Sequence, residues 1–265
     1  MVGERVTVRE LSGIEEMTAA STLWDSIWSR VEAGHEVDPA LMVALAHAGG
    51  YLAAAFVGGG GDTGSEMVGA ALGFWGSPAS SALHSHITGV LPTHAGQGVG
   101  TAIKLHQRDW VLGRGGTSIT WTYDPLVARN AHFNLNRLGA RPERYLLDVY
   151  GELSDDLNRG DPSDRLLARW SLTEAPAPAS DRPAAPLVET QDGAPAVGPG
   201  LDDDPTTALT VAVPEDITTL RREDPATASA WRAAVREALL PLLDRGWRVT
   251  GFDREHGYRL EAPPT

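Results

Sequence analysis

Three glycines at alternate positions, Gly96, Gly98 and Gly100, stand between a short apolar run and a helical pattern in residues 88–110, TGVLPTHAGQGVGTAIKLHQRDW. Backbone N–H groups at the start of a helix point outward and attract an anion. Glycine lets a phosphate approach closely because it has no Cβ. The stretch therefore predicts a turn that binds a phosphate or a pyrophosphate.

Two well-known phosphate motifs do not fit this turn. A P-loop needs a lysine directly after its last glycine, whereas Thr101 follows Gly100 here and Lys104 comes a helical turn later. A dinucleotide fingerprint needs its third glycine one residue further on, near the start of a parallel sheet. A turn with a purely structural role stays open as an alternative.

The strand that leads into the turn carries two histidines, His84 and His86. Residues two apart share one face of a strand, and an imidazole with an ordinary pKa of ~6.5 can act as a base directly or through water. We take His86 as the first candidate base and His84 as the second. Packing or hydrogen bonding of both on a sheet face is an equal alternative. No metal is expected, because no cluster of acidic residues or histidines completes a ligand set.

The elements that must position these groups follow from periodicity and from capping residues. The pattern predicts strands and helices in the order strand, two helices, three-stranded meander, glycine turn, helix, strand, helix and two strands. Their approximate ranges are 4–11, 14–31, 38–47, 51–58, 67–76, 83–91, 99–112, 117–124, 124–138, 141–151 and 164–172.

Residues 173–208 are rich in proline, alanine and aspartate, and this composition predicts a linker or a disordered segment. A strand–helix–strand pattern follows in residues 209–265, with Trp231, Val235 and Leu242 on one helix face that must be buried. We therefore expect a domain over 1–172, the linker, and a C-terminal extension that packs on the domain. A degenerate internal duplication is an open alternative.

Composition excludes several classes of protein. The 265 residues contain no cysteine, so disulfides and cysteine chemistry are excluded. The formal net charge of −13 repels phosphate backbones and argues against nucleic acid as a partner. No apolar run reaches the ~20 residues that span a membrane. The first residues lack the apolar core of a signal peptide, so a cytoplasmic location is expected.

The segment VLPTHAGQGVGTAIK resembles the acyl-CoA-binding motif of the GNAT superfamily of acyltransferases, in which Val-x-Pro precedes Arg/Gln-x-x-Gly-x-Gly/Ala and a helix. Val90, Pro92, Gly98 and Gly100 match, and so does the order of elements. NAHFNLNRLGA is similar to the second conserved region of the superfamily. Together with HSHITGVLP, WTYDPLVARN and SDRLLARW, it resembles an uncharacterised branch of predicted GNAT acetyltransferases over about residues 4–172.

The resemblance implies an α/β (α+β) fold with a central, mostly antiparallel mixed sheet that splays at the acyl-CoA site, and a small C-terminal α/β extension. It implies acetyl-CoA or another acyl-CoA as co-substrate and a small amine or amino acid as acceptor, with a homodimer left open. It places the cofactor on the residues of the turn and on one asparagine, namely Val90, Ala95, Gly96, Gln97, Gly98, Val99, Gly100, Thr101 and Asn130.

Two positions depart from the superfamily pattern. Ala95 stands where the motif has arginine or glutamine, and Leu135 stands where many members have the tyrosine that protonates the leaving thiolate. Tyr123 is the first candidate for a replacement acid and Tyr145 is the second. The sequence thus predicts an acyl-CoA-dependent N-acyltransferase. A non-catalytic module that binds acyl-CoA is the alternative.

Overall fold

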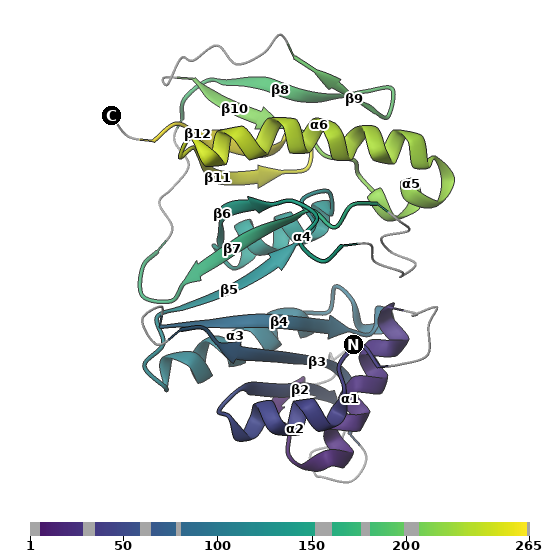
Figure 1. Cartoon of the computed structure of the whole chain (residues 1–265), viewed down its shortest axis with the longest axis vertical. Helices are drawn as coiled ribbons and strands as arrows, with labels where there is room; N and C mark the ends of the chain where they lie inside the picture. Colours follow the sequence, from purple (N-terminus) through teal and green to yellow (C-terminus); the bar gives the residue numbers. More distant parts are fainter. Residues whose placement is uncertain are drawn as a thin grey trace. The chain divides into compact units, whose positions relative to one another are not determined.

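The computed structural model describes residues 6–28, 35–58, 65–77, 81–151, 161–175, 181–198 and 207–263 (Figure 1). The chain forms two units, residues 1–120 and residues 121–265. The boundary falls inside strand β5 (Ser118–Tyr123), whose first half belongs to the first unit. No helix in the described stretches is both long and apolar enough to cross a membrane.

Alternating and alanine-rich runs form the sheet of the first unit. Its strands are β1 (Thr7–Glu10), β2 (Tyr51–Val57), β3 (Glu66–Trp75), β4 (Ala82–Val90) and the first half of β5. They lie in chain order, and each neighbouring pair from β1 to β4 is antiparallel. The pair β4 and β5 is parallel, with a register that runs from Ala82 opposite Ser118 to His84 opposite Thr120. The mixed, mostly antiparallel sheet that the sequence predicts is therefore confirmed.

The helices of the first unit lie on both faces of this sheet. They are α1 (Gly13–Trp28), α2 (Pro39–His47), the 3₁₀ turn η2 (Pro92–His94) and α3 (Val99–Leu112). A Cβ at Gly89 would meet Trp24 of α1, whereas a Cβ at Gly69 would meet Ile103 of α3. These two glycines point to opposite faces, because Gly89 pairs with the residue that follows Gly69. Small residues thus let a helix approach each face closely.

The second unit contains a hairpin and a second sheet. Its elements are α4 (Ala128–His132), the π-helical turn η3 (Phe133–Arg137), β6 (Arg141–Leu146), β7 (Arg165–Ser171), β8 (Ala184–Gln191), β9 (Ala194–Val197), β10 (Ala208–Val211), α5 (Ile217–Glu223), α6 (Pro225–Asp244), β11 (Arg248–Asp253) and β12 (Gly257–Glu261). Strands β6 and β7 pair antiparallel. The five-stranded sheet has the order β11-β12-β10-β8-β9, in which only β10 and β8 run parallel.

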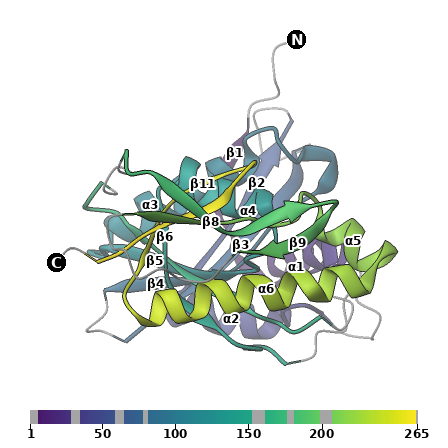
Figure 2. The same cartoon turned by 90° about the horizontal axis from the view of Figure 1, so that it is seen from above.

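Helix α6 carries the apolar face that the sequence predicts to be buried. Trp231, Val235 and Leu242 are each fully buried. Figure 2 shows α6 extended along β8 and β9, and the helix also contacts β6. The indole N–H of Trp231 donates to the carbonyl of Gly193, in the turn between β8 and β9. The C-terminal helix therefore covers strands from other parts of the second unit.

The expectation of a linker over 173–208 is wrong for its central part. Residues 184–197 form the antiparallel strands β8 and β9, joined by a turn in which Asp192 and Gly193 have positive φ. An Asp-Gly pair suits such a turn, and Leu187 and Val188 supply buried side chains. Residues 176–180 and 199–206 lie outside the described part.

The expected domain boundaries also differ from the units of the structure. The units divide at residue 120, whereas we expected the first domain to end at residue 172. Strands β6 and β7 fall before residue 172 and belong to the second unit, where α6 contacts β6. A separate acyltransferase domain over 1–172 therefore stays a prediction.

Candidate functional site

The glycine turn joins β4 to α3 and is open to solvent. Residues 95–98 form the turn, and all four are exposed. Gly96 and Gly98 have φ of 76° and 86°, a left-handed backbone that favours glycine, and a Cβ at either would have no atom within 4 Å. Gly98 is the N-cap of α3. The turn thus presents the first N–H groups of the helix with no side chain in front of them, which fits an anionic group.

The other predicted cofactor residues of the first unit surround this turn. Val90 and Thr101 are half-buried and Val99 is buried. A Cβ at Gly100 would lie 3.9 Å from Cγ2 of Val90, at ordinary contact distance. The side chain of Gln97 donates to the carbonyl of Thr93 at 3.0 Å, so it stabilises the turn itself.

Ala95 supplies no side-chain donor at the position where the motif has arginine or glutamine. Attraction of an anion at this turn must therefore come mainly from backbone N–H groups and the helix dipole.

The two histidines of β4 lie close together on the face that also carries Phe74. The ring centroids of His84 and His86 are 6.3 Å apart, and each lies within 5.7 Å of the Phe74 ring. Nδ1 of His84 is 3.4 Å from Oγ1 of Thr120. His86 lies two residues beyond the last pair of the β4–β5 register, and its side chain is exposed.

Both histidines favour the neutral form. Desolvation lowers the pKa of His84, and the charges of His86 and Lys104 lower it further. Desolvation also lowers the pKa of His86, while Glu36 acts in the opposite direction. A neutral imidazole is the form that accepts a proton, so either residue suits a general base at neutral pH.

Lys104, the only lysine of the chain, is buried between α3 and β4. Its Nζ donates to Oγ of Ser85 at 2.8 Å and to Oε1 of Gln107 at 3.1 Å. Burial lowers the pKa of Lys104 to about 7. No pattern in the sequence indicates this buried amine, because the apolar face of a helix rarely carries one. His106 on the same helix is half-buried, with Nδ1 2.9 Å from the Tyr51 hydroxyl.

The tyrosines proposed as acids belong to the second unit. Tyr123 is buried, and burial raises the pKa of its hydroxyl above the ordinary value. Tyr145 donates to Oδ2 of Asp164 at 2.7 Å. Leu135 is buried as well, so it contributes packing where many members of the superfamily have a tyrosine. Tyr145 is thus engaged in a structural hydrogen bond, which leaves Tyr123 as the better candidate.

Asn130, the predicted pantetheine contact, is an exposed residue of α4. The sequence predicts a helix that starts at Asp124-Pro125, but α4 starts three residues later, at Ala128. Oδ1 of Asp124 accepts from the N–H of Leu126 at 2.9 Å and closes the turn instead.

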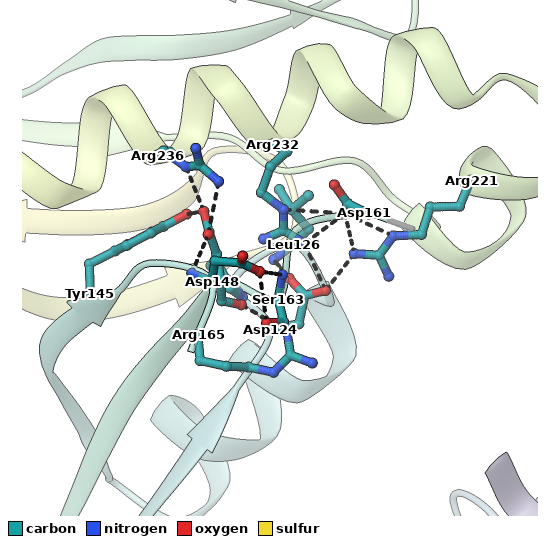
Figure 3. A network of polar contacts seen from close by, with 12 residues as sticks. Asp124, Leu126, Tyr145, Asp148, Asp161, Ser163, Arg165, Arg221, Arg232 and Arg236 are labelled. Atoms are coloured by element: carbon teal, nitrogen blue, oxygen red, sulfur yellow. Dashed lines mark hydrogen bonds and ion pairs between the residues drawn. The ribbon is translucent and has the colours of Figure 1, made fainter. Parts of the chain in front are cut away.

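Asp124 also belongs to a group of four buried charges that we name the buried ion cluster: Asp124, Asp161, Arg221 and Arg232 (Figure 3). Nη2 of Arg221 lies 2.6 Å from Oδ2 of Asp124 and 2.7 Å from Oδ2 of Asp161. Nη2 of Arg232 lies 3.0 and 2.8 Å from the same two oxygens. Two carboxylates and two guanidinium groups therefore neutralise one another.

The two arginines of the cluster keep Asp124 ionised. Burial alone would raise the pKa of Asp124, but Arg232 and Arg221 hold it at about 2. Beside the cluster, Arg236 donates from Nε and Nη2 to the two oxygens of Asp164, at 2.7 and 2.9 Å. The sequence could not reveal these partners, because Asp124 and Arg232 are 108 residues apart.

The described residues contain no group of three or more histidines and acidic residues placed to hold a metal ion. The turn of the first unit can bind an anion, and its histidines can transfer a proton.

Comparison with known proteins gives matches among solved structures. No protein-family model matches the chain, and no curated protein matches it either. The ribosomal-protein-S18-alanine N-acetyltransferase of Escherichia coli is 13% identical, with 66% of this chain and 99% of that chain covered and a TM-score of 0.47. A protein of Desulfovibrio desulfuricans assigned to the GNAT family is 17% identical, with 64% and 100% covered and a TM-score of 0.47.

The Salmonella typhimurium protein yncA, assigned as an acetyltransferase and solved with its cofactor acetyl-CoA, is 16% identical to this chain. The match covers 66% of this chain and 98% of that chain, with a TM-score of 0.50. The glycine turn between β4 and α3 and the mixed sheet agree with this likeness, and the chain therefore has the fold of the GNAT acetyltransferases.

Proposed function

We propose that this chain is an acyl-CoA-dependent N-acyltransferase that acylates a small amine or amino acid by direct attack, with acetyl-CoA as the first donor to test. The observation that carries the proposal is the open glycine turn, which leads from the histidine strand β4 into α3. The acetyl-CoA held by the Salmonella protein of the same fold supports it.

The pyrophosphate of CoA is proposed to bind over residues 95–101. The glycines leave room for the phosphate oxygens, and the helix N-terminus supplies the N–H donors. Asn130 remains the proposed pantetheine contact. The acceptor is proposed to be a small molecule, while a homodimer and a cytoplasmic location remain predictions.

His86 is the proposed general base. The amine nitrogen attacks the thioester carbonyl, a C–N bond forms, and the C–S bond breaks to release the CoA thiolate. His86 takes the proton that the ammonium nucleophile must lose, directly or through water. Tyr123 is the proposed acid for the thiolate, because a tyrosine hydroxyl carries a proton at neutral pH. The tyrosinate left behind takes the second proton, which the attacking nitrogen loses as the amide forms.

A non-catalytic acyl-CoA-binding module is the second candidate. Ala95 and Leu135 favour it, because each replaces a side chain that many members of the superfamily use. A thiol-release assay with acetyl-CoA and pooled amines separates the two candidates. Release above the hydrolytic background supports the enzyme, whereas CoA binding without release supports the module.

Replacement of His86 by glutamine tests the base. We expect turnover to fall about 10²–10⁴-fold with little change in CoA affinity, because glutamine cannot accept the proton. The lowered pKa of His86 also predicts that the acid limb of the wild-type kcat/KM profile lies below pH ~6.5.

The matched control is His84→Gln, on the same strand and beside the same Phe74 ring. Normal turnover in His86→Gln together with loss in His84→Gln would transfer the role to His84. A loss of turnover and of CoA affinity in proportion to a lower Tm would mean that His86 is only structural.

A further inference from the structure

The turn that follows β5, Asp124–Leu126, is held by side chains from three C-terminal elements. Arg221 of α5 and Arg232 of α6 both donate to Oδ2 of Asp124 (Figure 3). The hydroxyl of Tyr258, on β12, donates to the carbonyl of Pro125 at 2.8 Å. The conformation of this turn is thus fixed by residues about a hundred positions away in sequence.

Local interactions give the turn less support. The N–H of Val127 donates to the carbonyl of Asp124 at 3.2 Å, and that of Leu126 donates to its side chain. Val127, the N-cap of α4, makes no side-chain capping bond. The backbone conformation at the start of α4 therefore depends on the contacts that Asp124 and Pro125 make.

The turn separates the two residues of the second unit to which the proposed function gives a role. Tyr123 directly precedes it, and Asn130 lies in the first turn of α4 behind it. A shift of the turn therefore moves both side chains. Reacting groups tolerate little displacement, because a misplacement of about 1 Å can cost on the order of 10²-fold in rate.

We propose that Arg232, Arg221 and Tyr258 are positioning residues for the acyl-transfer reaction, which hold the Asp124–Leu126 turn so that Tyr123 and Asn130 keep their places. This inference rests on the proposed function. It makes the C-terminal elements α5, α6 and β12 part of the catalytic apparatus of the chain.

The chemistry of the buried ion cluster suits such a role. Arginine presents its N–H donors in a rigid planar fork, and its hydrogen bonds to carboxylates are strong and directional. Asp161 accepts from both arginines, including Nε of each, and so fixes the planes of the two guanidinium groups. Apolar side chains in these places would fill the space, but they would not orient the Asp124 carboxylate.

The experiment compares Tyr258→Phe and Arg232→Met with Arg236→Met in the full-length chain. Arg236 lies one helical turn from Arg232 on α6 and binds Asp164, not the turn. Tyr258→Phe removes one hydroxyl and keeps the buried ring, so it tests the proposal even where Arg232→Met folds poorly. Arg232→Lys restores the charge without the planar fork.

The first readout is amide hydrogen exchange of residues 124–131, which does not depend on catalysis. Loss of one hydrogen bond predicts about 5-fold faster exchange there in Tyr258→Phe, with the rest of the second unit unchanged. The second readout is kcat with acetyl-CoA, measured well below each Tm. We expect kcat to fall about 10-fold or more in Tyr258→Phe and Arg232→Met, only partial recovery in Arg232→Lys, and a change within about 2-fold in Arg236→Met.

Unchanged exchange at residues 124–131 in Tyr258→Phe would overturn the proposal, as would equal losses of kcat in Arg232→Met and Arg236→Met. Full recovery of kcat in Arg232→Lys would show that charge alone suffices and would overturn the role of the planar fork. Absence of turnover in the wild type would contradict the proposed function alone, because the exchange readout still decides whether these residues hold the turn.

Discussion

The two units of the chain both bury charged groups, but they do so in different ways. The first unit buries one amine, Lys104, whose hydrogen-bond acceptors Ser85 and Gln107 are neutral. The buried ion cluster of the second unit contains four charges that alternate in sign within hydrogen-bonding distance. Desolvation penalises both arrangements, and in the second the attraction between opposite charges offsets it.

The difference appears directly in the pKa values. Burial lowers the pKa of Lys104 to about 7, so a large fraction of this amine is neutral at physiological pH. In the buried ion cluster, Arg232 and Arg221 overcome the effect of burial and hold the pKa of Asp124 at about 2. The pKa of the buried amine is thus lowered toward neutrality, whereas the buried carboxylate between two arginines stays ionised and gives the structure fixed, directional contacts.

The largest expected effect is on stability, from breaking the buried ion cluster. Arg232→Met removes an arginine that binds both Asp124 and Asp161 in a buried place, so we expect the free energy of unfolding to fall by about 3–5 kcal/mol. Urea denaturation measures the change. The control is Arg222→Met, which removes an exposed arginine paired with Glu223. If the two variants lost equal stability, the cluster would not be the strong contact that its burial implies.

A pH-dependent effect of similar size is expected at Lys104. Between pH ~7 and ~10 the unfolded chain holds a proton on this amine that the folded chain has lost. The contribution of Lys104 to the free energy of unfolding therefore rises with pH between pH ~7 and ~10, by about 1.4 kcal/mol per pH unit. Lys104→Met should remove this slope, as seen in the wild-type minus variant difference from urea denaturation at pH 7.5, 8.5 and 9.5. Parallel curves for the two proteins would contradict the account.

Asp124 predicts a smaller effect, at acid pH and with the same sign, since stability again rises with pH. Its folded pKa of about 2 lies below that of an unfolded aspartate, so its contribution is complete above pH ~4 and is lost as pH falls through ~2. The loss amounts to about 2 kcal/mol. Asp124→Asn should be less stable than the wild type at pH 6 and should lose less stability on acidification. An equal loss in both proteins would mean that the pairing with arginine is weak.

The sequence predicts those parts of the fold and site that depend on neighbouring residues. Asp38-Pro39 opens α2 as its capping pattern predicts, and the side chain of Asp38 accepts from the N–H of Leu41. The glycine turn was found in the same way, since the end of β4, the glycines and the start of α3 are consecutive. The meander of β2, β3 and β4 followed from short apolar runs, whereas the mixed sheet was implied by the resemblance to the GNAT superfamily.

The parts that the sequence did not predict depend on partners far away in the chain. Strands β8 and β9 lie in a segment whose composition indicates a linker, and burial against α6 overrides that composition. The Asp192-Gly193 pair was the available signal for this hairpin. The residues next to Asp124 predict that it caps a helix. They do not indicate its contacts with Arg221 and Arg232, which lie far away in the sequence.

The central claim, that CoA binds at the glycine turn, is tested most directly by the affinity of Gly98→Val and Gly115→Val for CoA. Both glycines have left-handed backbones, with φ of 86° and 78°, and at both a Cβ would meet no atom within 4 Å. The two variants therefore carry similar backbone strain, but only Gly98 lies in the turn. By isothermal titration calorimetry we expect Gly98→Val to bind CoA about 10-fold or more weakly, a loss of roughly 1.4 kcal/mol, and Gly115→Val to bind like the wild type. Wild-type affinity in Gly98→Val would contradict the claim.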